Sequence, residues 1–254
     1  MGVPSSQISA VWVQEELSGT TWVLLREVLF SALRKKLATY SEEAIWDLVE
    51  GNLTFVAEHL RDCVADWLVD GSVQRFEIDN DPSPYVRLTG SVPSEVVLKL
   101  RRIDPYAFEH VCANVLAALG ATSRTTQRTN DGGVDFLAAN LNVVPTPLAI
   151  PATSRTSVIG QAKRYRDGNP VSETQLREFI GGATLWRHKL LRDGTIGPLS
   201  PVMFAFWTTS DFDKNAKQFA RELGLWYMDG VTLAGYVVAL GLKASVLELA
   251  DAPK

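Results

Sequence analysis

Apolar residues in the first 70 positions recur about every three to four residues, which is the spacing of one face of an α-helix. This pattern predicts a helix over residues 21–38 and a second over 44–49, which starts after Ser41 and stops at Gly51. A third helix is expected over 54–70. The preceding residues are expected to form a short polar leader.

The pattern then changes to two β-like runs, over 73–78 and 85–88. The segment between them, 79–84, consists of Asp, Asn, Pro and Ser, which is strong turn composition. Helices followed by a two-stranded wing are the order of a winged helix. The sequence therefore predicts a helical, winged-helix-like N-terminal domain over residues 1–95.

The helix expected over 54–70 would be the recognition helix of such a domain, but its charge does not suit DNA. It carries Glu58, Asp62, Asp66 and Asp70, opposed only by Arg61. Because DNA presents phosphates, an acidic helix is poorly suited to its grooves. We expect residues 1–95 to serve assembly or a protein partner. The alternative is that the wing recognises modified DNA through Arg75 and Arg87.

Residues 91–94 have the composition of a linker, and beyond them helical and strand patterns alternate. Helices are expected over 105–119, 173–190 and 213–223, with a last one from about 231, and strands over 121–127, 134–138, 158–163, 202–208 and 225–228. This order predicts that residues 96–254 form an α/β sandwich with a mixed central sheet. The Pro-rich connection over 140–156 is unusually long, and we expect a flexible loop; a flap that contacts DNA or a partner is the alternative.

Composition places the chain among ordinary globular proteins. Its 254 residues suffice for two domains, and hydrophobic residues make up 46% and charged residues 21%. No apolar run approaches the ~20 residues of a membrane span, so no membrane partner is expected. The N-terminus does not resemble a secretory signal, which indicates a cytoplasmic protein. Cys63 and Cys112 are expected to be buried free thiols.

The net charge of −4 hides an asymmetry between the two halves. Residues 1–100 contain 8 Lys and Arg against 15 Asp and Glu, a balance of −7, whereas residues 101–254 contain 17 against 14, a balance of +3. Clustered positive charge can neutralise phosphates and steer nucleic acid. The second half is therefore the expected polyanion-binding part, and Arg128, Arg164 and Arg166 are its candidate DNA-binding residues.

The candidate chemistry lies around two neighbouring strands. Asp131-Gly132-Gly133-Val134-Asp135 enters one strand, and Gln161-Ala162-Lys163 ends the next. Side chains two residues apart in a strand share a face, so Gln161 and Lys163 should point together. The carboxylate of Asp135 and the main-chain carbonyl of Ala162 are hard oxygen donors suited to Mg²⁺, with Mn²⁺ as a substitute. Lys163 would orient a water and offset negative charge on a phosphate.

These motifs resemble the Mrr-like branch of the PD-(D/E)xK restriction-endonuclease superfamily. The resemblance extends over most of residues 98–242 and includes Phe108-Glu109, Asp131-Gly132-Gly133-Val134-Asp135, Gln161-Ala162-Lys163-Arg164-Tyr165, Arg177-Glu178-Phe179-Ile180-Gly181-Gly182-Ala183 and Phe206-Trp207-Thr208-Thr209-Ser210-Asp211-Phe212. It implies a PD-(D/E)xK fold, DNA as substrate and Mg²⁺ as cofactor. It also implies Asp135, Gln161 and Lys163 as the active triad, with Glu109 as an additional acid at the metal. Gln161 replaces the acid of the general pattern, as in Mrr-type members.

The sequence thus predicts a magnesium-dependent endodeoxyribonuclease acting in restriction or antiphage defence. One active site hydrolyses one strand, so we expect a homo-oligomer, with residues 1–95 as its assembly surface. The competing hypothesis is a catalytically silent DNA-binding or assembly module that retains the nuclease fold.

Overall fold

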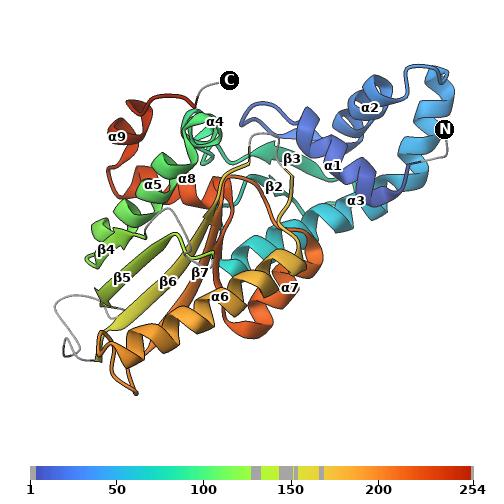
Figure 1. Ribbon diagram of the computed structural model, residues 1–254. Coiled ribbons are helices and arrows are strands. Elements are labelled where there is room, and N and C mark those ends of the chain that lie inside the picture. Colours follow the sequence, from blue (N-terminus) through green and yellow to red (C-terminus); the bar gives the residue numbers. More distant parts are fainter. Residues whose placement is uncertain (1–3, 127–132, 143–150, 152–153, 166–168, 253–254) are drawn as a thin grey trace. The chain divides into compact units, whose positions relative to one another are not determined.

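The computed structural model of the chain describes residues 4–126, 133–142, 151, 154–165 and 169–252 (Figure 1). It divides into two compact units, Met1–Val92 and Pro93–Lys254, whereas the sequence placed the boundary after residue 95. In the part of the chain that is described, no helix is long and apolar enough to cross a membrane.

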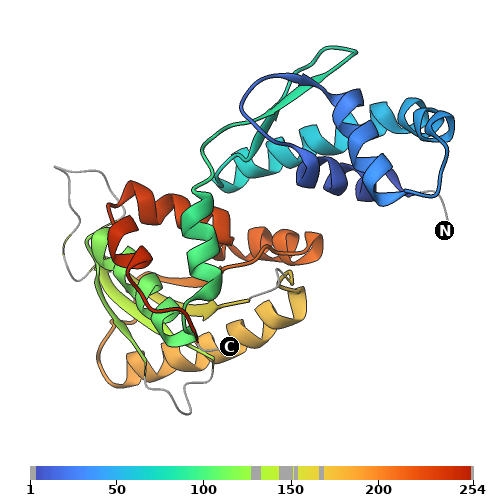
Figure 2. The same ribbon diagram turned by 90° about the horizontal axis from the view of Figure 1, so that it is seen from above.

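The first unit is helical with a small sheet. Its elements are α1 (Ser6–Glu16), β1 (Val23–Leu24), α2 (Leu25–Lys36), α3 (Glu42–Asp70), β2 (Phe76–Ile78) and β3 (Tyr85–Leu88). The strands form an antiparallel sheet in the order β1-β3-β2. In Figure 2 the helices pack together and the β2–β3 hairpin lies beside them. This order confirms the winged-helix-like prediction for the N-terminal part.

Two details of the helix prediction for this unit are wrong. The expected leader contains α1, which begins after Ser5, whose side chain accepts a hydrogen bond from the backbone of Ile8. Gly51 does not stop a helix, because α3 runs through it without a break. A helical glycine costs only about 1 kcal/mol, and burial of residues on both sides of it outweighs that cost. These buried residues are Ile45, Val49, Val56, Ala57, Leu60 and Trp67.

The side chain of Arg61 on α3 supports the wing. Its Nε and Nη2 atoms donate to the backbone carbonyl of Asp79, at 3.2 and 2.9 Å, just beyond the end of β2. The one cation that offsets the acidic residues of α3 is therefore engaged with the β2–β3 turn.

The second unit is built around a five-stranded mixed sheet. Its elements are α4 (Ser94–Arg102), α5 (Pro105–Ala118), β4 (Thr122–Thr125), β5 (Phe136–Leu141), β6 (Thr156–Lys163), α6 (Glu173–Arg192), β7 (Val202–Thr208), α7 (Lys214–Leu223), β8 (Trp226–Met228), α8 (Gly230–Ala239) and α9 (Lys243–Leu247). The strand order is β4-β5-β6-β7-β8. Pairs β4/β5 and β5/β6 are antiparallel, whereas β6/β7 and β7/β8 are parallel.

Helices cover both faces of this sheet, which makes the unit an α/β sandwich. Helix α5 packs on β4, β5 and β6, and α6 packs on β6 and β7 from the other side (Figure 1). Helix α7 shares the α6-side core through Ala216 and Ala220. The predicted fold class is confirmed in both parts of the chain.

The strands that carry the candidate chemistry differ slightly from the sequence prediction. Strand β5 extends to Leu141 instead of ending at Ala138, and its pairing with β6 shifts register between these residues. Asn140 has a φ of 64°, and Asn tolerates this left-handed conformation better than most residues. The predicted loop over 140–156 therefore begins inside β5, and its central part, residues 143–150 and 152–153, lies outside the described residues. Helix α9 was not expected.

Candidate active site

Asp135 lies immediately before β5, and hydrogen bonds hold it against β6 on one side and against Thr126, the residue after β4, on the other. Its backbone N–H donates to the carbonyl of Gly160 at 2.9 Å, and its own carbonyl accepts from the N–H of Thr126 at 3.0 Å. Its Oδ2 atom accepts from the N–H of Ala162 at 2.8 Å. The carboxylate is therefore held beside the last residues of β6.

The backbone of β6 adds a second oxygen on the same side. In a strand, the N–H and C=O of one residue point to the same neighbouring strand, and those of the next residue point the other way. The carbonyl of Lys163 points to β7, where it accepts from the N–H of Thr209 at 3.2 Å. The carbonyl of Ala162 must then point away from β7, as its N–H does toward Asp135.

Gln161 and Lys163 share one face of β6, as their spacing predicts. Gln161 is 7% exposed, whereas Lys163 is half-buried. Gly133 has a φ of 79°, and a Cβ placed on it would lie 3.2 Å from the Nε2 atom of Gln161. Glycine therefore both permits the turn before Asp135 and leaves room for this amide. The structure brings Asp135, Gln161 and Lys163 to one end of β6.

Glu109 lies on α5, the helix that packs on β5 and β6. The Cys112 thiol, one helical turn further along α5, is fully buried, and burial raises its pKa well above the ordinary value. The negative charges of Asp135 and Glu109 raise the pKa of this thiol further. Both carboxylates therefore act on the same thiol, and Glu109 remains a candidate residue of the site. Cys112 is a free buried thiol, as expected, whereas Cys63 is only half-buried.

The donors at this end of β6 fit a hard cation. Among the described residues, no group of three or more His, Cys, Asp or Glu gathers to hold a metal ion. Mg²⁺ does not need such a cage, because it keeps several water ligands and is held by one or two carboxylates and substrate phosphates. The carboxylate of Asp135 and the carbonyl of Ala162 are oxygen donors of this kind, and Glu109 on α5 is the candidate second carboxylate.

The three candidate DNA-binding arginines have different outcomes. Arg164 is half-buried, and its Nη1 atom donates to the backbone carbonyl of Arg101 at 3.2 Å, a structural contact that the sequence did not indicate. Arg128 and Arg166 lie outside the described residues.

Buried hydroxyls lie beside Lys163, in residues that the sequence analysis quoted only as part of the resemblance and to which it gave no role. Thr208, Thr209 and Ser210 are 0%, 1% and 4% exposed and follow one another at the end of β7. The hydroxyl of Thr208 donates to the carbonyl of Lys163 at 2.8 Å. The signal was present in the sequence, as consecutive hydroxyl residues after an apolar strand.

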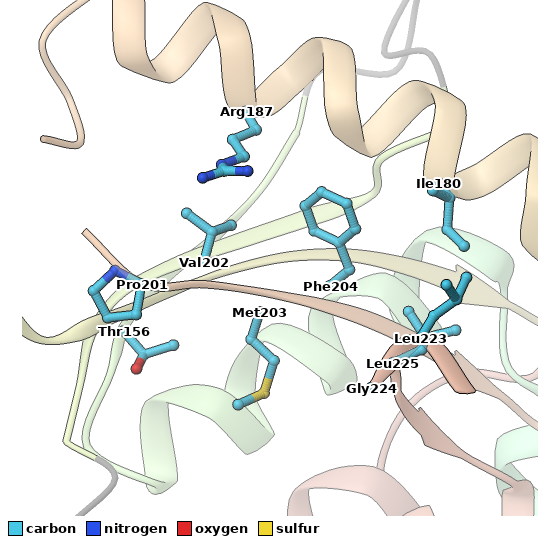
Figure 3. Close-up of a pocket in the computed structure, with 10 residues that line it drawn as sticks. All are labelled: Thr156, Ile180, Arg187, Pro201, Val202, Met203, Phe204, Leu223, Gly224 and Leu225. Atoms are coloured by element: carbon cyan, nitrogen blue, oxygen red, sulfur yellow. The ribbon is translucent and has the colours of Figure 1, made fainter. Parts of the chain in front are cut away.

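A cavity of about 520 Å³ lies at the opposite end of these strands (Figure 3). It is lined by Thr156, Ile180, Arg187, Pro201, Val202, Met203, Phe204, Leu223, Gly224 and Leu225. Thr156 and Val202 are the first residues of β6 and β7, whereas Gln161 and Lys163 lie at the end of β6. The cavity is therefore separate from the candidate active site.

Comparisons with known proteins give a family and a set of distant structures. The family model Mrr_cat, described as a restriction endonuclease, matches residues 100–196. No curated protein matches the chain. Similar solved structures include the MspJI restriction endonuclease in complex with a 27-mer oligonucleotide, at 22% identity over 56% of this chain and 31% of that chain, with a TM-score of 0.36. The DNA modification-dependent restriction endonuclease AspBHI has 21% identity over 63% and 38%, with a TM-score of 0.42. Restriction endonuclease FokI bound to DNA has 14% identity over 95% and 47%, with a TM-score of 0.37.

These structural likenesses are weak. Their TM-scores are all below 0.5, so nothing about the function of this chain is inferred from them. The chain spans less than half the length of each of these three structures. The match of residues 100–196 to the family model covers α5, β5, β6 and α6, and so includes Glu109, Asp135, Gln161 and Lys163.

Proposed function

We propose that the protein is a metal-dependent DNA endonuclease acting in restriction or antiphage defence, and the premise is the match of residues 100–196 to the Mrr_cat restriction-endonuclease family model. The observation that carries the proposal is the placement of Asp135. Its carboxylate is held against the backbone of Ala162, in the stretch of β6 that presents Gln161 and Lys163. Carboxylate, amide, ammonium and an oriented carbonyl in one place are the groups that phosphodiester hydrolysis needs.

In the proposed reaction, a water oxygen forms a bond to phosphorus while one ester P–O bond breaks. The water loses a proton, and the leaving oxygen gains one. Lys163 holds the attacking water and offsets the charge that develops on the phosphate. Asp135, Glu109 and the carbonyl of Ala162 would hold Mg²⁺ or Mn²⁺, which when bound lowers the pKa of water and neutralises phosphate charge. Gln161 contributes a neutral amide that keeps the water and phosphate oriented.

The experiment is cleavage of plasmid, phage and methylated DNA by the full-length protein with Mg²⁺, Mn²⁺ or EDTA. Asp135→Ala and Lys163→Ala should each lower the cleavage rate by about 100-fold or more, as removal of charge-stabilising groups does in other enzymes. Lys214→Ala and Asp193→Asn, two exposed positions outside the site, are the matched controls and should cleave like the unmodified protein.

Each outcome decides a different part of the proposal. Absence of metal-dependent cleavage on every substrate argues for the catalytically silent module. Cleavage that is undiminished in Asp135→Ala and Lys163→Ala keeps the activity but rejects the site. Mn²⁺ binding measured by calorimetry separates the two functions further, because a silent module has no need of metal at Asp135.

We propose that residues 1–92 serve assembly and do not read DNA. The two wing arginines that could reach DNA have intramolecular contacts: Arg87 pairs with Glu77 at 2.6 Å and lies 4.5 Å from the centre of the Trp22 ring, and Arg75 lies 5.4 Å from that of Trp67. Apolar side chains on α1 and α3 are exposed, among them Ile8 at 48%, Val11 at 52% and Phe55 at 57%. Cutting both strands of a duplex most simply requires two active sites related by symmetry.

Light scattering on the full-length protein tests this assignment. A dimer that becomes a monomer in Val11→Glu, together with accumulation of nicked instead of linear plasmid, supports assembly through this unit. A monomer whose DNA affinity and salt dependence both fall in Arg87→Ala instead supports a DNA-reading wing.

A further inference from the structure

Lys163 lies at the end of a strand, because it is the last residue of β6. Its partner in β7 is Thr208, which is also the last residue of its strand. Strand ends open more readily than strand centres, because no further ladder hydrogen bonds hold them. Catalytic groups, in contrast, must stay within about 0.5 Å of their productive position. Something beyond the regular ladder must hold this end of β6 in place.

The hydroxyls of Thr208 and Thr209 continue the pairing where the backbone ladder stops. The Lys163 carbonyl accepts from the Thr208 hydroxyl at 2.8 Å and from the Thr209 N–H at 3.2 Å. Two residues further on, the Thr209 Oγ1 atom accepts from the N–H of Tyr165 at 2.8 Å and donates to the carbonyl of Tyr165 at 3.0 Å. A single hydroxyl thus does for Tyr165 what the N–H and C=O of an opposing strand residue would do. We call these contacts of Thr208 and Thr209 the threonine clamp.

The clamp itself is fixed to the helices around it. The carbonyl of Thr209 accepts from the Nε atom of Arg101, at the end of α4, at 3.2 Å. Gly230, at the start of α8, approaches the same carbonyl so closely that a Cβ there would lie 2.4 Å from it. Thr209 is only 1% exposed, so its buried position disfavours replacement of Tyr165 by water as the hydrogen-bond partner of its hydroxyl.

The strand end is also tied to α6. The Tyr165 hydroxyl accepts from the Nε2 atom of Gln175 at 2.6 Å, and the Oε1 atom of the same Gln175 accepts from the N–H of Ser172, the residue that caps α6. The chain just after Lys163 is therefore anchored to α6 as well as to Thr209.

We infer that Thr209 is a positioning residue for Lys163: its hydroxyl closes the end of β6 and keeps the ammonium in place for the nuclease reaction. The inference rests on the proposed function, because Lys163 has a position to keep only if it acts on a phosphate. Thr209 itself touches no reacting atom. Its removal should lower the rate of the chemical step and leave DNA binding largely unchanged.

Three variants of the full-length protein separate the hydroxyl from its surroundings. Thr209→Val keeps the branched shape and removes the hydroxyl, whereas Thr209→Ser keeps the hydroxyl. Ser123→Ala is the matched control, since it removes another part-buried hydroxyl-to-carbonyl hydrogen bond, 2.6 Å to Ala113, from the same unit. We expect kcat to fall about tenfold or more in Thr209→Val with KM changed less than about twofold, and to stay within about twofold in the other two variants.

Hydrogen exchange supplies a readout that does not depend on cleavage. The amide of Tyr165 should exchange faster in Thr209→Val, since its acceptor is lost, and at the original rate in Thr209→Ser and Ser123→Ala.

Unchanged exchange of the Tyr165 amide in Thr209→Val overturns the clamp. Faster exchange with unchanged kcat overturns the positioning role and leaves the proposed function standing. Equal losses of kcat in Thr209→Val and Ser123→Ala would assign the effect to general destabilisation and also overturn the inference. If the unmodified protein cleaves no DNA with any metal, the proposed function fails, and the positioning role fails with it even where the exchange result is as expected.

Discussion

Gly160 in the middle of the site's main strand should not tolerate even one added methyl group. A Cβ built on Gly160 would lie 2.0 Å from the Cε2 atom and 2.1 Å from the Cζ atom of the Phe136 ring. Ordinary contact begins near 3.4 Å, so ring or strand would have to move by about 1.4 Å, which is the difference from 2.0 Å. The ring cannot simply turn aside, because Phe136 is fully buried and its centroid lies 5.0 Å from that of Trp207.

We therefore expect Gly160→Ala to destabilise the protein by about 3 kcal/mol, the upper end of the usual cost of overpacking. In a unit of this size that corresponds to a fall in Tm of roughly 6–12 °C. DNA cleavage should fall as well, because the carbonyl of Gly160 is the acceptor that holds the backbone of Asp135. Urea unfolding followed by circular dichroism and Trp fluorescence measures the stability change.

Two further variants test the reasoning behind this value. Gly181→Ala is the matched control, because nothing lies within 4 Å of its Cβ position on α6, and it should not destabilise. Phe136→Leu shortens the ring side chain, so the double variant with Gly160→Ala should be less destabilised than the two single effects added together. A Gly160→Ala protein within about 0.5 kcal/mol of the original would refute the argument, since that is the range of neutral surface substitutions.

Other positions give sharp expectations of their own. Gly51→Ala should raise stability by about 0.5–1 kcal/mol in urea unfolding, because Gly51 lies inside α3 with open space at its Cβ position. Cys63 should react with a maleimide in the native protein while Cys112, which is buried and has a raised pKa, reacts only after unfolding; peptide mass spectrometry distinguishes them. Hydrogen bonds from Lys35 and Ser31 lower the pKa of the Glu16 carboxyl, so its contribution to stability is present above its ordinary pKa and disappears as pH falls through the lowered one. Glu16→Gln should therefore flatten the loss of stability in acid titrations, and an unchanged acid profile would contradict this.

The first unit shows why local sequence signals placed its elements correctly in kind but not in extent. Gly51 disfavours a helix by about 1 kcal/mol, yet α3 continues through it, because burial of apolar residues before and after the glycine contributes more than the glycine costs. Helix α1 was overlooked because its exposed face carries Ile8 and Val11, which weakens the contrast between an apolar and a polar side. Strand β1, only two residues long, exists through its pairing with β3, which no local pattern reveals.

The placement of the candidate site residues was more predictable, because Gln161 and Lys163 are two residues apart in one strand. Two-residue spacing alone puts Gln161 and Lys163 on one face, and the glycines before Asp135 indicate the turn that lets its carboxylate reach the backbone of Ala162.

The contacts that the end of β7 makes with the backbone of Lys163 and Tyr165 could not be predicted from the sequence in the same way. They join the hydroxyls of Thr208 and Thr209 to the backbone of residues more than 40 positions earlier, and a backbone acceptor leaves no mark on the sequence. A threonine at the end of a buried strand is compatible with a cap, a turn or a ladder contact, and only the parallel register of β6 and β7 selects among them. The placement of the candidate site residues could therefore be predicted from the sequence, whereas the contacts that hold the end of β6 required the register of the sheet.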